Sequence, residues 1–568
     1  MEEIIHIHQK RPWYKYWQKG FPFKLDYPKV ALFDIIETSY RRYPDKTAII
    51  YYGNRMSYRE LWESILNLSG HLKDMGISKG DRVALFLENS PHFIISFFAV
   101  LRANGVAVPI NPMAKGEGLQ SIIKDTGSTV AITTSNLLQQ FSDVMGETSI
   151  GKVIVGKHSD YMPAVPEITI PAGIKDDEVI PTQTVQWMDL VKRTSQPPVP
   201  LVEADDIATL IYTSGTTGVS KGCIHTSKTI MATMLANYYL FVNTSSSIHL
   251  TSLPLFHVTG LINAFTCLFA GGTVVLLARW DKEAAIQAIK TYRCTHWINI
   301  TAMVIDVLSI PSISSHDLSS LLIVGGGGAP LPKAIGEKLQ QITGMTYLEG
   351  YGLSESFATT HLNPLGRPKL QCLGIPVFGV DALIIDIESK KLLPSGERGE
   401  LIISGPSIMN GYWNNQDETE RAFIDVNGTT YLRTGDICYM DEEGYFFIVD
   451  RAKRMINRAG FKVWPTAVEA TLYKHPAIKE VCVIKVSKPR IIEEVKAVVV
   501  LNEGYRNRIN PEDIINWAKE RMSAYSYPRI VEFVDELPKS TTGKILWKKL
   551  EENQRLESNS DGANSHTR

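Results

Sequence analysis

A stretch rich in glycine and hydroxyl side chains, YTSGTTGVSKG, runs from Tyr212 to Gly222 and contains one cation, Lys221. Backbone N–H groups, hydroxyls and a lysine suit the binding of an anion such as phosphate. The spacing does not match the phosphate loop GxxxxGK[ST], because Gly215 and Gly218 are only three apart and Lys221 precedes a glycine. The apolar runs IATLIYT and CIHT flank the stretch, so we expect a loop between two strands. Two interpretations stay open here: an anion nest, or a hairpin tip whose glycines only permit positive φ.

The segments that must position this loop alternate between strand and helix. TAIIYY, RVALFLE and VAVPINP have the composition of buried strands, and SYRELWESILNLSGHLKDMG between the first two has helical periodicity. This alternation predicts an α/β fold with a large N-terminal domain of mainly parallel layers. After about residue 370, short strands and turns predict a smaller β-rich portion, and VCVIKV and KAVVVLN with two helical stretches predict a small α+β unit. We expect domains at 1–450 and 451–550, and a disordered polar tail at 551–568.

Composition and charge exclude several classes of protein. The net charge of -1 gives no basic field for nucleic acid, and six cysteines scattered singly argue against disulfides or a zinc site. No signal-peptide layout precedes the fold, so we expect a cytoplasmic protein. Between Thr229 and Ala278 the sequence contains no Asp, Glu, Lys or Arg. Because Gly271-Gly272 interrupts this run, a buried helix and strand are favoured over a membrane span, which needs about 20 continuous apolar residues.

Eight motifs in order identify a resemblance that covers roughly residues 30 to 550. After YTSGTTGVSKG come LPLFH (253–257), GGGGAPL (325–331), GYGLSES (350–356), GELIISGPSIMNGYWNN (399–415), YLRTGD (431–436), DRAKRMINRAGFKVWPTAVE (450–469) and PKSTTGKI (538–545). The series resembles the adenylate-forming superfamily of acyl-CoA synthetases, adenylation domains and luciferases. It is most similar to bacterial and archaeal medium- or long-chain fatty acyl-CoA ligases.

The resemblance implies a reaction in two halves that uses ATP, Mg²⁺ and CoA. A carboxylate attacks the α-phosphorus of ATP to give an acyl-adenylate and pyrophosphate, and a thiol then displaces AMP. The implied ATP-binding residues are Thr213, Ser214, Gly215, Thr216, Thr217, Lys221, Gly328, Ala329, Pro330, Glu349, Tyr351, Gly352, Ser354, Asp436, Arg451 and Lys544. Lys221 has an alternative interpretation as an exposed loop lysine.

Within that set the resemblance implies individual roles. Lys544, Thr216 and Glu355 are the implied catalytic residues. Glu355 matches the Mg²⁺ ligand, and one glutamate is sufficient because Mg²⁺ prefers one or two carboxylates with phosphate oxygens and water. Tyr351 would stack on adenine, Ser354 would contact the α-phosphate, and Asp436 and Arg451 would bind the ribose hydroxyls.

The C-terminal domain is implied to be mobile. Lys453 matches the hinge about which it rotates between the two half-reactions, withdrawing Lys544 from the cleft. Gly460 would line the tunnel for the pantetheine arm of CoA. Asn457 departs from relatives that have a lysine there, which puts luciferase-type oxidative chemistry in doubt.

The acyl pocket is expected to exclude amino acids, since no carboxylate between Thr229 and Ala278 could pair with an ammonium group. The expected pocket residues are His257, Trp297, Asn299, Gly325, Gly326, Gly327 and Gly352. Glycines would leave room for a tail, and Trp297 could gate or shorten the pocket. A lone histidine is more often a hydrogen-bonded core residue, but the LPLFH motif favours the pocket for His257. A medium- or long-chain fatty acid is favoured, and aromatic acids stay open.

Two further functions stay open on the sequence. An adenylating ligase could deliver its product to a carrier protein, although the chain contains no carrier domain and CoA is therefore favoured as the acceptor. A catalytically inactive member could bind nucleotide or acyl-CoA as a sensor, although competent residue types occupy the catalytic positions. We expect a monomer or homodimer, with a carboxylic acid, ATP and CoA as its small-molecule partners.

Overall fold

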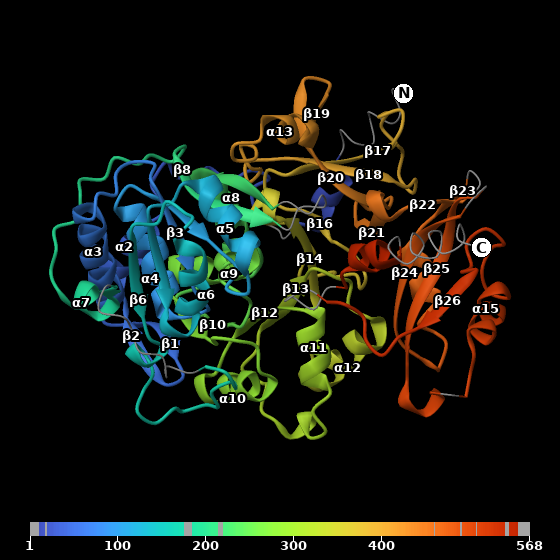
Figure 1. Ribbon diagram of the computed structural model, residues 1–568, viewed down its shortest axis with the longest axis horizontal. Helices are drawn as coiled ribbons and strands as arrows, with labels where there is room; N and C mark the ends of the chain where they lie inside the picture. Colours follow the sequence, from blue (N-terminus) through green and yellow to red (C-terminus); the bar gives the residue numbers. More distant parts are fainter. Residues whose placement is uncertain are drawn as a thin grey trace, which may run out of the picture.

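A computed structural model describes residues 11–17, 20–174, 184–213, 220–458, 461–488, 491–506, 508–539 and 545–554. It has three parts: a large α/β part, a β-rich unit and a C-terminal unit, which is drawn red in Figure 1. These correspond to the fold class expected from the sequence.

The large part contains two sheets. The seven-stranded sheet has the order β7 (Val185–Gln186), β6 (Lys152–Gly156), β5 (Val130–Thr134), β3 (Arg82–Phe86), β4 (Val106–Pro109), β8 (Ile207–Thr213), β9 (Lys221–Thr226). The nine-stranded sheet has the order β16 (Ile375–Pro376), β15 (Ala358–Leu362), β14 (Leu348–Leu353), β13 (Ile323–Gly327), β12 (His296–Ile300), β10 (Ile248–Thr251), β11 (Thr273–Leu276), β1 (Thr47–Tyr51), β2 (Asn54–Ser57). Most neighbouring strands are parallel, as predicted, and the antiparallel pairs lie at the sheet edges.

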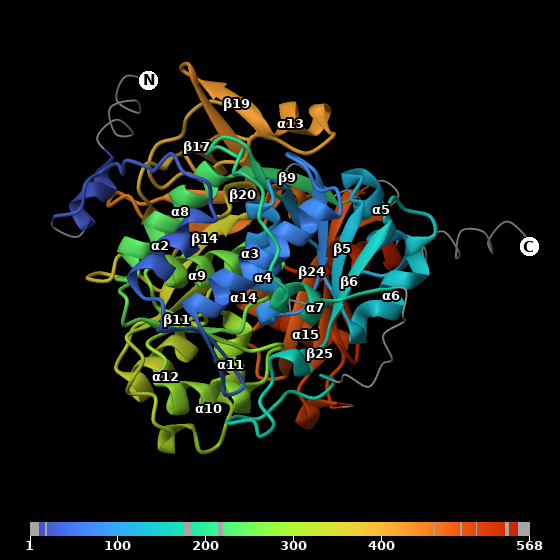
Figure 2. The same cartoon turned by 90° about the vertical axis from the view of Figure 1, so that its left-hand side faces the viewer.

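Alternate residues of β3 show why the seven-stranded sheet is apolar on both faces. Val83 and Leu85 belong to the main core, whereas Ala84 and Phe86 belong to a second core. The second core includes residues of α5 (Gly116–Thr126) and α6 (Ser135–Met145), which lie beside β5 and β6 in Figure 2. Parallel sheets need such cover on both faces, which explains the continuous apolar runs in the sequence.

Two helices pack between the sheets. The almost wholly buried α4 (Pro91–Arg102) contacts β3 and β4, and α9 (Val258–Phe269) contacts β10 and β11. They meet where the Phe265 ring lies 4.9 Å from the rings of Phe97 and Phe98. The predicted buried helix and strand between Leu261 and Ala278 are thus confirmed as α9 and β11. Among the described residues, no helix has both the length and the apolar character required to cross a membrane.

The other helices of the large part cover the outer faces or connect the strands. They are α2 (Asp34–Arg42), α3 (Tyr58–Asp74), α7 (Trp187–Lys192), α8 (Ser227–Leu240), α10 (Lys282–Tyr292), α11 (Thr301–Leu308) and α12 (Lys333–Thr343). Helix α3 begins at a capping box in which Ser57 and Glu60 exchange hydrogen bonds with each other's backbone N–H groups. The six cysteines are free thiols, as their scattered positions predicted, and all six are buried.

A polar cluster joins the two sheets inside the large part. Glu88, which follows β3, accepts hydrogen bonds from Arg279 Nε (2.6 Å) and Asn136 Nδ2 (3.0 Å) and lies 3.2 Å from His158 Nε2. His158 in turn contacts the Tyr51 hydroxyl on β1 at 2.7 Å. Burial alone would raise the pKa of Glu88, but the hydrogen bonds from His158 and Arg279 hold it below its ordinary value. The carboxylate is therefore ionised and fully enclosed by partners.

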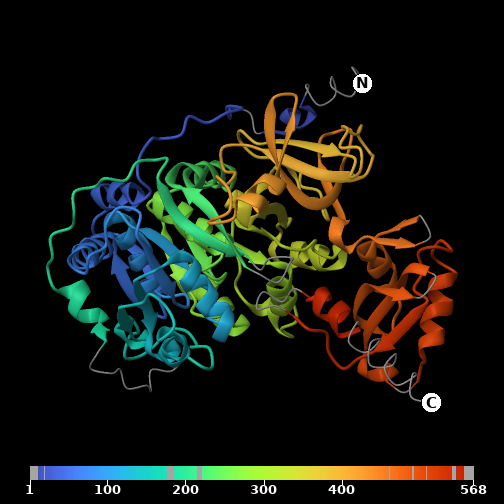
Figure 3. The same cartoon turned by 45° about the horizontal axis from the view of Figure 1, so that its top comes forward.

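The β-rich unit is antiparallel. It contains β17 (Asp381–Ile385), β18 (Gly399–Ser404), β20 (Thr429–Met440) and β19 (Phe423–Val426) in that order, with β21 (Phe446–Arg451) paired to β20 and α13 (Gln416–Ala422) beside it. The N-terminal 3-10 helix η1 (Pro12–Tyr16) lies against this unit in Figure 3. Its Trp13 is fully buried, with its ring 6.1 Å from that of Phe446.

The C-terminal unit has a separate core. Its sheet contains β24 (Ile478–Lys488), β25 (Ile491–Leu501) and β26 (Ile530–Phe533). The hairpin of β22 (Ile456–Arg458) and β23 (Phe461–Val463) contacts β25 through β22, while α14 (Pro465–Leu472) contacts β24 and α15 (Pro511–Lys519) contacts β26. This is the α+β composition expected. The exact domain boundaries at 450 and 550 stay predictions, and the segment 555–568 lies outside the described residues.

Candidate active site

The glycine-rich stretch joins two antiparallel strands, as predicted: β8 ends at Thr213, β9 begins at Lys221, and these two residues are paired. Four predicted nucleotide contacts, Ser214, Gly215, Thr216 and Thr217, lie outside the described residues, as do Gly460 and Lys544. Their roles stay predictions.

Lys221 is not the exposed loop lysine of the alternative interpretation. Its side chain is only 12% exposed and forms an ion pair with Glu418 at the start of α13. Its ammonium group also lies 5.2 Å from the centre of the Tyr412 ring. The lysine is therefore held in place by groups from the β-rich unit, and its predicted contact with a nucleotide stays a prediction.

Three predicted residues from three strands meet in one cluster. Tyr351 on β14 donates its hydroxyl to Asp436 Oδ2 on β20 at 2.7 Å, and Arg451 Nε at the end of β21 lies 3.0 Å from Asp436 Oδ1. Asp436 and Arg451 are paired in register across β20 and β21. The carboxylate is buried, whereas the arginine side chain is 41% exposed. The adjacent Asp436 raises the pKa of Arg451, and burial raises that of Tyr351, so the arginine is charged and the tyrosine is a hydroxyl donor.

A tight turn after β14 holds Ser354 and Glu355. Glu355 Oε1 accepts the Tyr412 hydroxyl at 2.8 Å, and the Ser354 carbonyl lies 2.7 Å from His225 Nε2 on β9. Burial lowers the pKa of His225 to about 4, so at neutral pH its ring is uncharged and can donate to that carbonyl. Phe357 ends the turn with a φ of 47°, a conformation that costs a non-glycine residue energy and often marks functional sites.

Glu355 fits the requirements of Mg²⁺ better than those of a metal held by the protein alone. No group of three or more His, Cys, Asp or Glu residues in the described part of the chain could hold a metal ion. A cation at Glu355 would need oxygen ligands from a phosphate and from water, which is the coordination that Mg²⁺ favours.

Glu349, a predicted nucleotide contact, faces the protein interior. Its Oε1 accepts the backbone N–H of Gln371 at 2.6 Å and its Oε2 that of Leu331 at 3.4 Å. Burial raises the pKa of Glu349 to about 7, and these two hydrogen bonds only partly oppose the shift. The side chain is therefore engaged with the loops on either side of β14, and any contact with ATP stays a prediction. Nearby, Ala329 accepts the Thr301 hydroxyl through its carbonyl at 2.8 Å.

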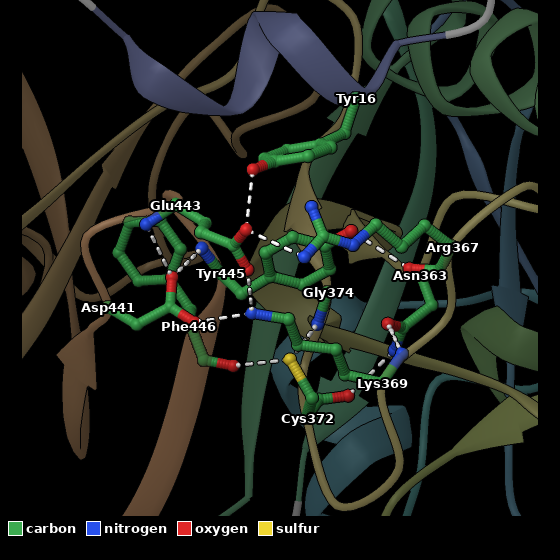
Figure 4. A network of polar contacts seen from close by, with 10 residues as sticks. All are labelled: Tyr16, Asn363, Arg367, Lys369, Cys372, Gly374, Asp441, Glu443, Tyr445 and Phe446. Carbon is green, nitrogen blue, oxygen red and sulfur yellow. Dashed lines mark hydrogen bonds and ion pairs between the residues drawn. The ribbon is translucent and has the colours of Figure 1, made fainter.

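A polar network connects the loop after β15 to Tyr16 of the N-terminal segment (Figure 4). Asn363 donates to the carbonyls of Glu349 (3.0 Å) and Cys372 (2.9 Å). Its Oδ1 accepts the backbone N–H of Lys369, whose ammonium group donates to Asp441 and Glu443 at 2.6 Å each. Tyr16 donates its hydroxyl to Glu443 at 2.7 Å. Hydrogen bonds and ion pairs thus connect the β-rich unit, the loop after β15 and η1.

The predicted acyl-pocket residues are brought near one another by β12, β13 and β14, but some have structural partners. Asn299 accepts the Tyr347 hydroxyl at 2.9 Å, and the Trp297 ring stacks on that of Trp280 at 6.2 Å. His257 precedes α9, where its Nδ1 accepts the Thr259 N–H at 3.4 Å, and burial lowers its pKa. The core and pocket interpretations of His257 are therefore both still open.

All four predicted pocket glycines lie too close to backbone carbonyl oxygens for a Cβ, and the contact is closest at two of them. A Cβ on Gly326 would lie 1.8 Å from the Asn299 carbonyl oxygen, and one on Gly352 would lie 1.6 Å from that of Ala358. At these two positions the close backbone contact by itself explains why only glycine fits. Whether Gly325, Gly326, Gly327 and Gly352 border an acyl pocket stays a prediction.

The predicted hinge, Lys453, lies in η5 (Ala452–Arg454) directly after β21. The preceding Asp450 is buried, and its Oδ2 accepts the backbone N–H of Thr466 at the start of α14 at 2.7 Å. Arg454 Nη2 contacts Glu469 Oε1 at 2.5 Å and the Val483 carbonyl at 3.1 Å. The link into the C-terminal unit is therefore ordered by ion pairs and hydrogen bonds in this arrangement.

Sequence reasoning missed Tyr412 and Glu418 as contacts of predicted site residues. Tyr412 lies within one of the motifs, but a single tyrosine has no spacing that indicates its partner. Glu418 lies 197 residues from Lys221, and it is one of several acidic residues in α13.

Family models and relatives agree over nearly the whole chain. Residues 36–413 match the AMP-binding enzyme family and residues 467–544 match the AMP-binding enzyme C-terminal domain. A long-chain-fatty-acid–CoA ligase of Bacillus subtilis is 33% identical over 559 residues, 96% of this chain and 99% of the relative. A feruloyl-CoA synthase of Amycolatopsis is 31% identical over 89% of this chain and 95% of its own. The crystal structure of ATP-bound MatB from Rhodopseudomonas palustris superposes with a TM-score of 0.80 at 25% identity, covering 92% of this chain and 98% of that one.

Proposed function

The chain belongs to the AMP-binding enzyme family and is an AMP-forming acyl-CoA synthetase, and on that premise we propose that it activates a medium- or long-chain fatty acid. The observation that carries the proposal is the 33% identity to a long-chain-fatty-acid–CoA ligase across 96% of the chain. The uncharged interval from Thr229 to Ala278, which includes His257, supports an apolar acid over an amino acid.

The cluster of Asp436, Tyr351 and Arg451 suits the nucleoside of ATP. A buried carboxylate can accept hydrogen bonds from two neighbouring ribose hydroxyls, and such charge-assisted bonds are strong and specific. Tyr351 would present its ring to adenine while its hydroxyl stays on Asp436. Arg451 would bind a ribose hydroxyl while it neutralises the carboxylate.

The phosphates would lie between the loop 213–221 and Glu355. Thr213, Ser214, Gly215, Thr216, Thr217 and Lys221 would supply N–H groups, hydroxyls and charge to the β- and γ-phosphates, with Ser354 on the α-phosphate. Mg²⁺ held by Glu355 would neutralise phosphate charge when bound. Lys544 would bridge the carboxylate of the acid and the α-phosphate as negative charge develops there, which is the kind of stabilisation that accelerates acyl adenylation most.

Transfer to CoA would follow a rotation of the C-terminal unit about Lys453, which removes Lys544 and brings Gly460 to the thiol path. In that second step the CoA thiol would lose its proton to solvent and its sulfur would bond to the acyl carbon, while the bond from the acyl carbon to the phosphate oxygen of AMP breaks and AMP leaves. A cytoplasmic location would give access to both ATP and CoA.

An aromatic acid is the second candidate. It is favoured by the similarity to a feruloyl-CoA synthase and by the flat surface of the stacked Trp280 and Trp297 rings, which could line an aryl pocket. Apolar pockets discriminate weakly by shape alone, so the two candidates need a direct comparison.

The test is CoA-dependent AMP formation with ATP and Mg²⁺ against acetate, butyrate, octanoate, palmitate, benzoate and 4-coumarate. A kcat/KM for octanoate or palmitate at least tenfold above the aromatic acids is expected. The reverse order would move the substrate to the aromatic class, and pyrophosphate release without CoA-dependent AMP formation would move the acceptor to a carrier protein.

The role of Lys544 is tested by separating the half-reactions. Lys544→Ala should reduce pyrophosphate release at least 100-fold, yet it should still transfer a supplied acyl-adenylate to CoA at the wild-type rate. Lys549→Ala, in the exposed part of the neighbouring helix, is the matched control and should affect neither step. Equal losses in both half-reactions for Lys544→Ala would contradict the two-state cycle.

A further inference from the structure

Tyr412 contacts both sides of the candidate phosphate site. Its hydroxyl donates to Glu355 Oε1 at 2.8 Å, and its ring lies 5.2 Å from the ammonium group of Lys221. Its backbone N–H donates to the Thr419 hydroxyl of α13 at 2.9 Å, which fixes the position of the tyrosine main chain. One side chain therefore touches the residue proposed to hold Mg²⁺ and the lysine proposed to meet the phosphates.

Backbone hydrogen bonds on either side of Tyr412 also connect β9, which bears Lys221, to the turn that bears Glu355. Trp413 donates its N–H to the Gly222 carbonyl at 2.7 Å, and Ile224 donates to the Gly411 carbonyl at 3.0 Å. On the other side, Met409 donates its N–H to the Glu355 carbonyl at 2.8 Å. Residues 409–413 thus pair with β9 directly after the glycine-rich loop and with the turn that bears Glu355. They set the distance between the two.

The direction of the hydrogen bond is fixed by chemistry. A tyrosine phenol, with an ordinary pKa of about 10, carries its proton at neutral pH and is the donor in the 2.8 Å contact with Glu355 Oε1. An ionised carboxylate only accepts hydrogen bonds. The hydroxyl therefore occupies one lone-pair direction of the Glu355 carboxylate and limits its rotation about the Cγ–Cδ bond.

We propose that Tyr412 is a positioning residue that orients the Glu355 carboxylate for Mg²⁺ and holds it in register with the strand bearing Lys221. The proposal rests on the proposed function, in which Glu355 is the Mg²⁺ ligand. Partners that orient a metal ligand through a hydrogen bond typically contribute about 10- to 100-fold to metal affinity or activity.

The experiment measures binding of an ATP analogue with a methylene bridge between the α- and β-phosphorus atoms, by calorimetry, with Mg²⁺ and then with EDTA. The ratio of the two dissociation constants is the gain that Mg²⁺ provides. Tyr412→Phe keeps the ring beside Lys221 and removes only the donor. We expect its Mg²⁺-dependent gain to fall about tenfold while its affinity for the metal-free analogue stays at the wild-type value.

Tyr431→Phe is the matched control, because Tyr431 also donates its hydroxyl to a carboxylate, Asp381, at 2.9 Å. It should leave the Mg²⁺-dependent gain unchanged. A double-mutant cycle with Glu355→Gln adds a test of the mechanism, since Tyr412→Phe should have no further effect on the gain once the carboxylate is absent.

Two results would overturn the positioning role but leave the metal assignment in place, provided that Glu355→Gln abolishes the Mg²⁺-dependent gain. The first is a wild-type gain in Tyr412→Phe. The second is that Tyr412→Phe weakens binding of the ATP analogue equally with and without Mg²⁺. Retention of the full gain by Glu355→Gln would instead show that Glu355 does not hold the metal. That result would overturn the metal assignment of the proposed function, and the positioning role with it.

Discussion

Two buried carboxylates of this enzyme differ in what surrounds them. Glu88 is enclosed within the large part by Arg279, His158 and Asn136, all of which follow or lie close to the strands of its two sheets. Asp436 is also buried, and its cation Arg451 is as exposed as Arg279 (41% and 42%), but Arg451 is the last residue before the link to the C-terminal unit. The Asp436 Oδ1 lacks an aligned hydrogen-bond donor in the described part of the chain.

The difference indicates which carboxylate serves stability and which can serve a ligand. A buried charge whose partners all come from one packed region has no capacity to change partners, and removing it leaves its cation and donors unsatisfied. Asp436 has one oxygen on the Tyr351 hydroxyl, and its other oxygen has no aligned donor in the described part of the chain. Ligand hydroxyls could therefore donate to that oxygen at low cost.

The largest effect is expected from Glu88→Gln. Loss of the charge should lower the free energy of unfolding by about 3 kcal/mol, because the fully buried His158 loses an ionised acceptor, whereas the half-exposed Arg279 can be hydrated. The thermal midpoint measures this loss, and kcat/KM measured well below that midpoint should stay within twofold of wild type. A large loss of activity without a loss of stability would remove the contrast between the two carboxylates.

Asp436→Asn should have the opposite effects, with little change in stability and a large loss of activity. The variant keeps an acceptor for Tyr351, and Arg451 can be hydrated, so the thermal midpoint should change little. The KM for ATP should rise, and kcat/KM should fall roughly 10- to 100-fold, because a charge-assisted hydrogen bond is worth about 1.5–3 kcal/mol. Unchanged kinetics for ATP would contradict a ribose-binding role.

A smaller effect, on how stability depends on pH, should distinguish Glu349 from Glu88. Because burial raises the pKa of folded Glu349 to about 7, its protonated form stabilises the fold below the unfolded pKa of about 4.5, and this contribution is lost as the pH rises through 7. As the pH rises from 5 to 8, the free energy of unfolding of Glu349→Gln should therefore increase by about 2 kcal/mol relative to that of wild type. Glu88 has the reverse sign, since its lowered pKa gives stability that is lost as the pH falls.

The comparison of thermal midpoints at the two pH values tests this expectation. Wild type and Glu349→Gln should converge at pH 5 and separate at pH 8. Parallel pH profiles would show that Glu349 does not ionise between these values in the folded protein.

Residue types and their order determined the family, the two half-reactions and most of the elements, because short motifs such as GYGLSES and the apolar periodicity are local properties of the chain. The strand–loop–strand at Tyr212–Gly222 and the buried helix and strand near Leu261 were predictable for the same reason.

Only the tertiary structure decided which strands share a sheet and which side chains meet. TAIIYY and RVALFLE are both apolar strands, yet β1 and β3 belong to different sheets, and no local signal distinguishes them. Lys221 meets Glu418, Glu355 meets Tyr412, and Asp436 meets Arg451 only because distant segments pair through their backbones. Hydrogen bonds and ion pairs depend on distances between atoms, and the fold sets those distances.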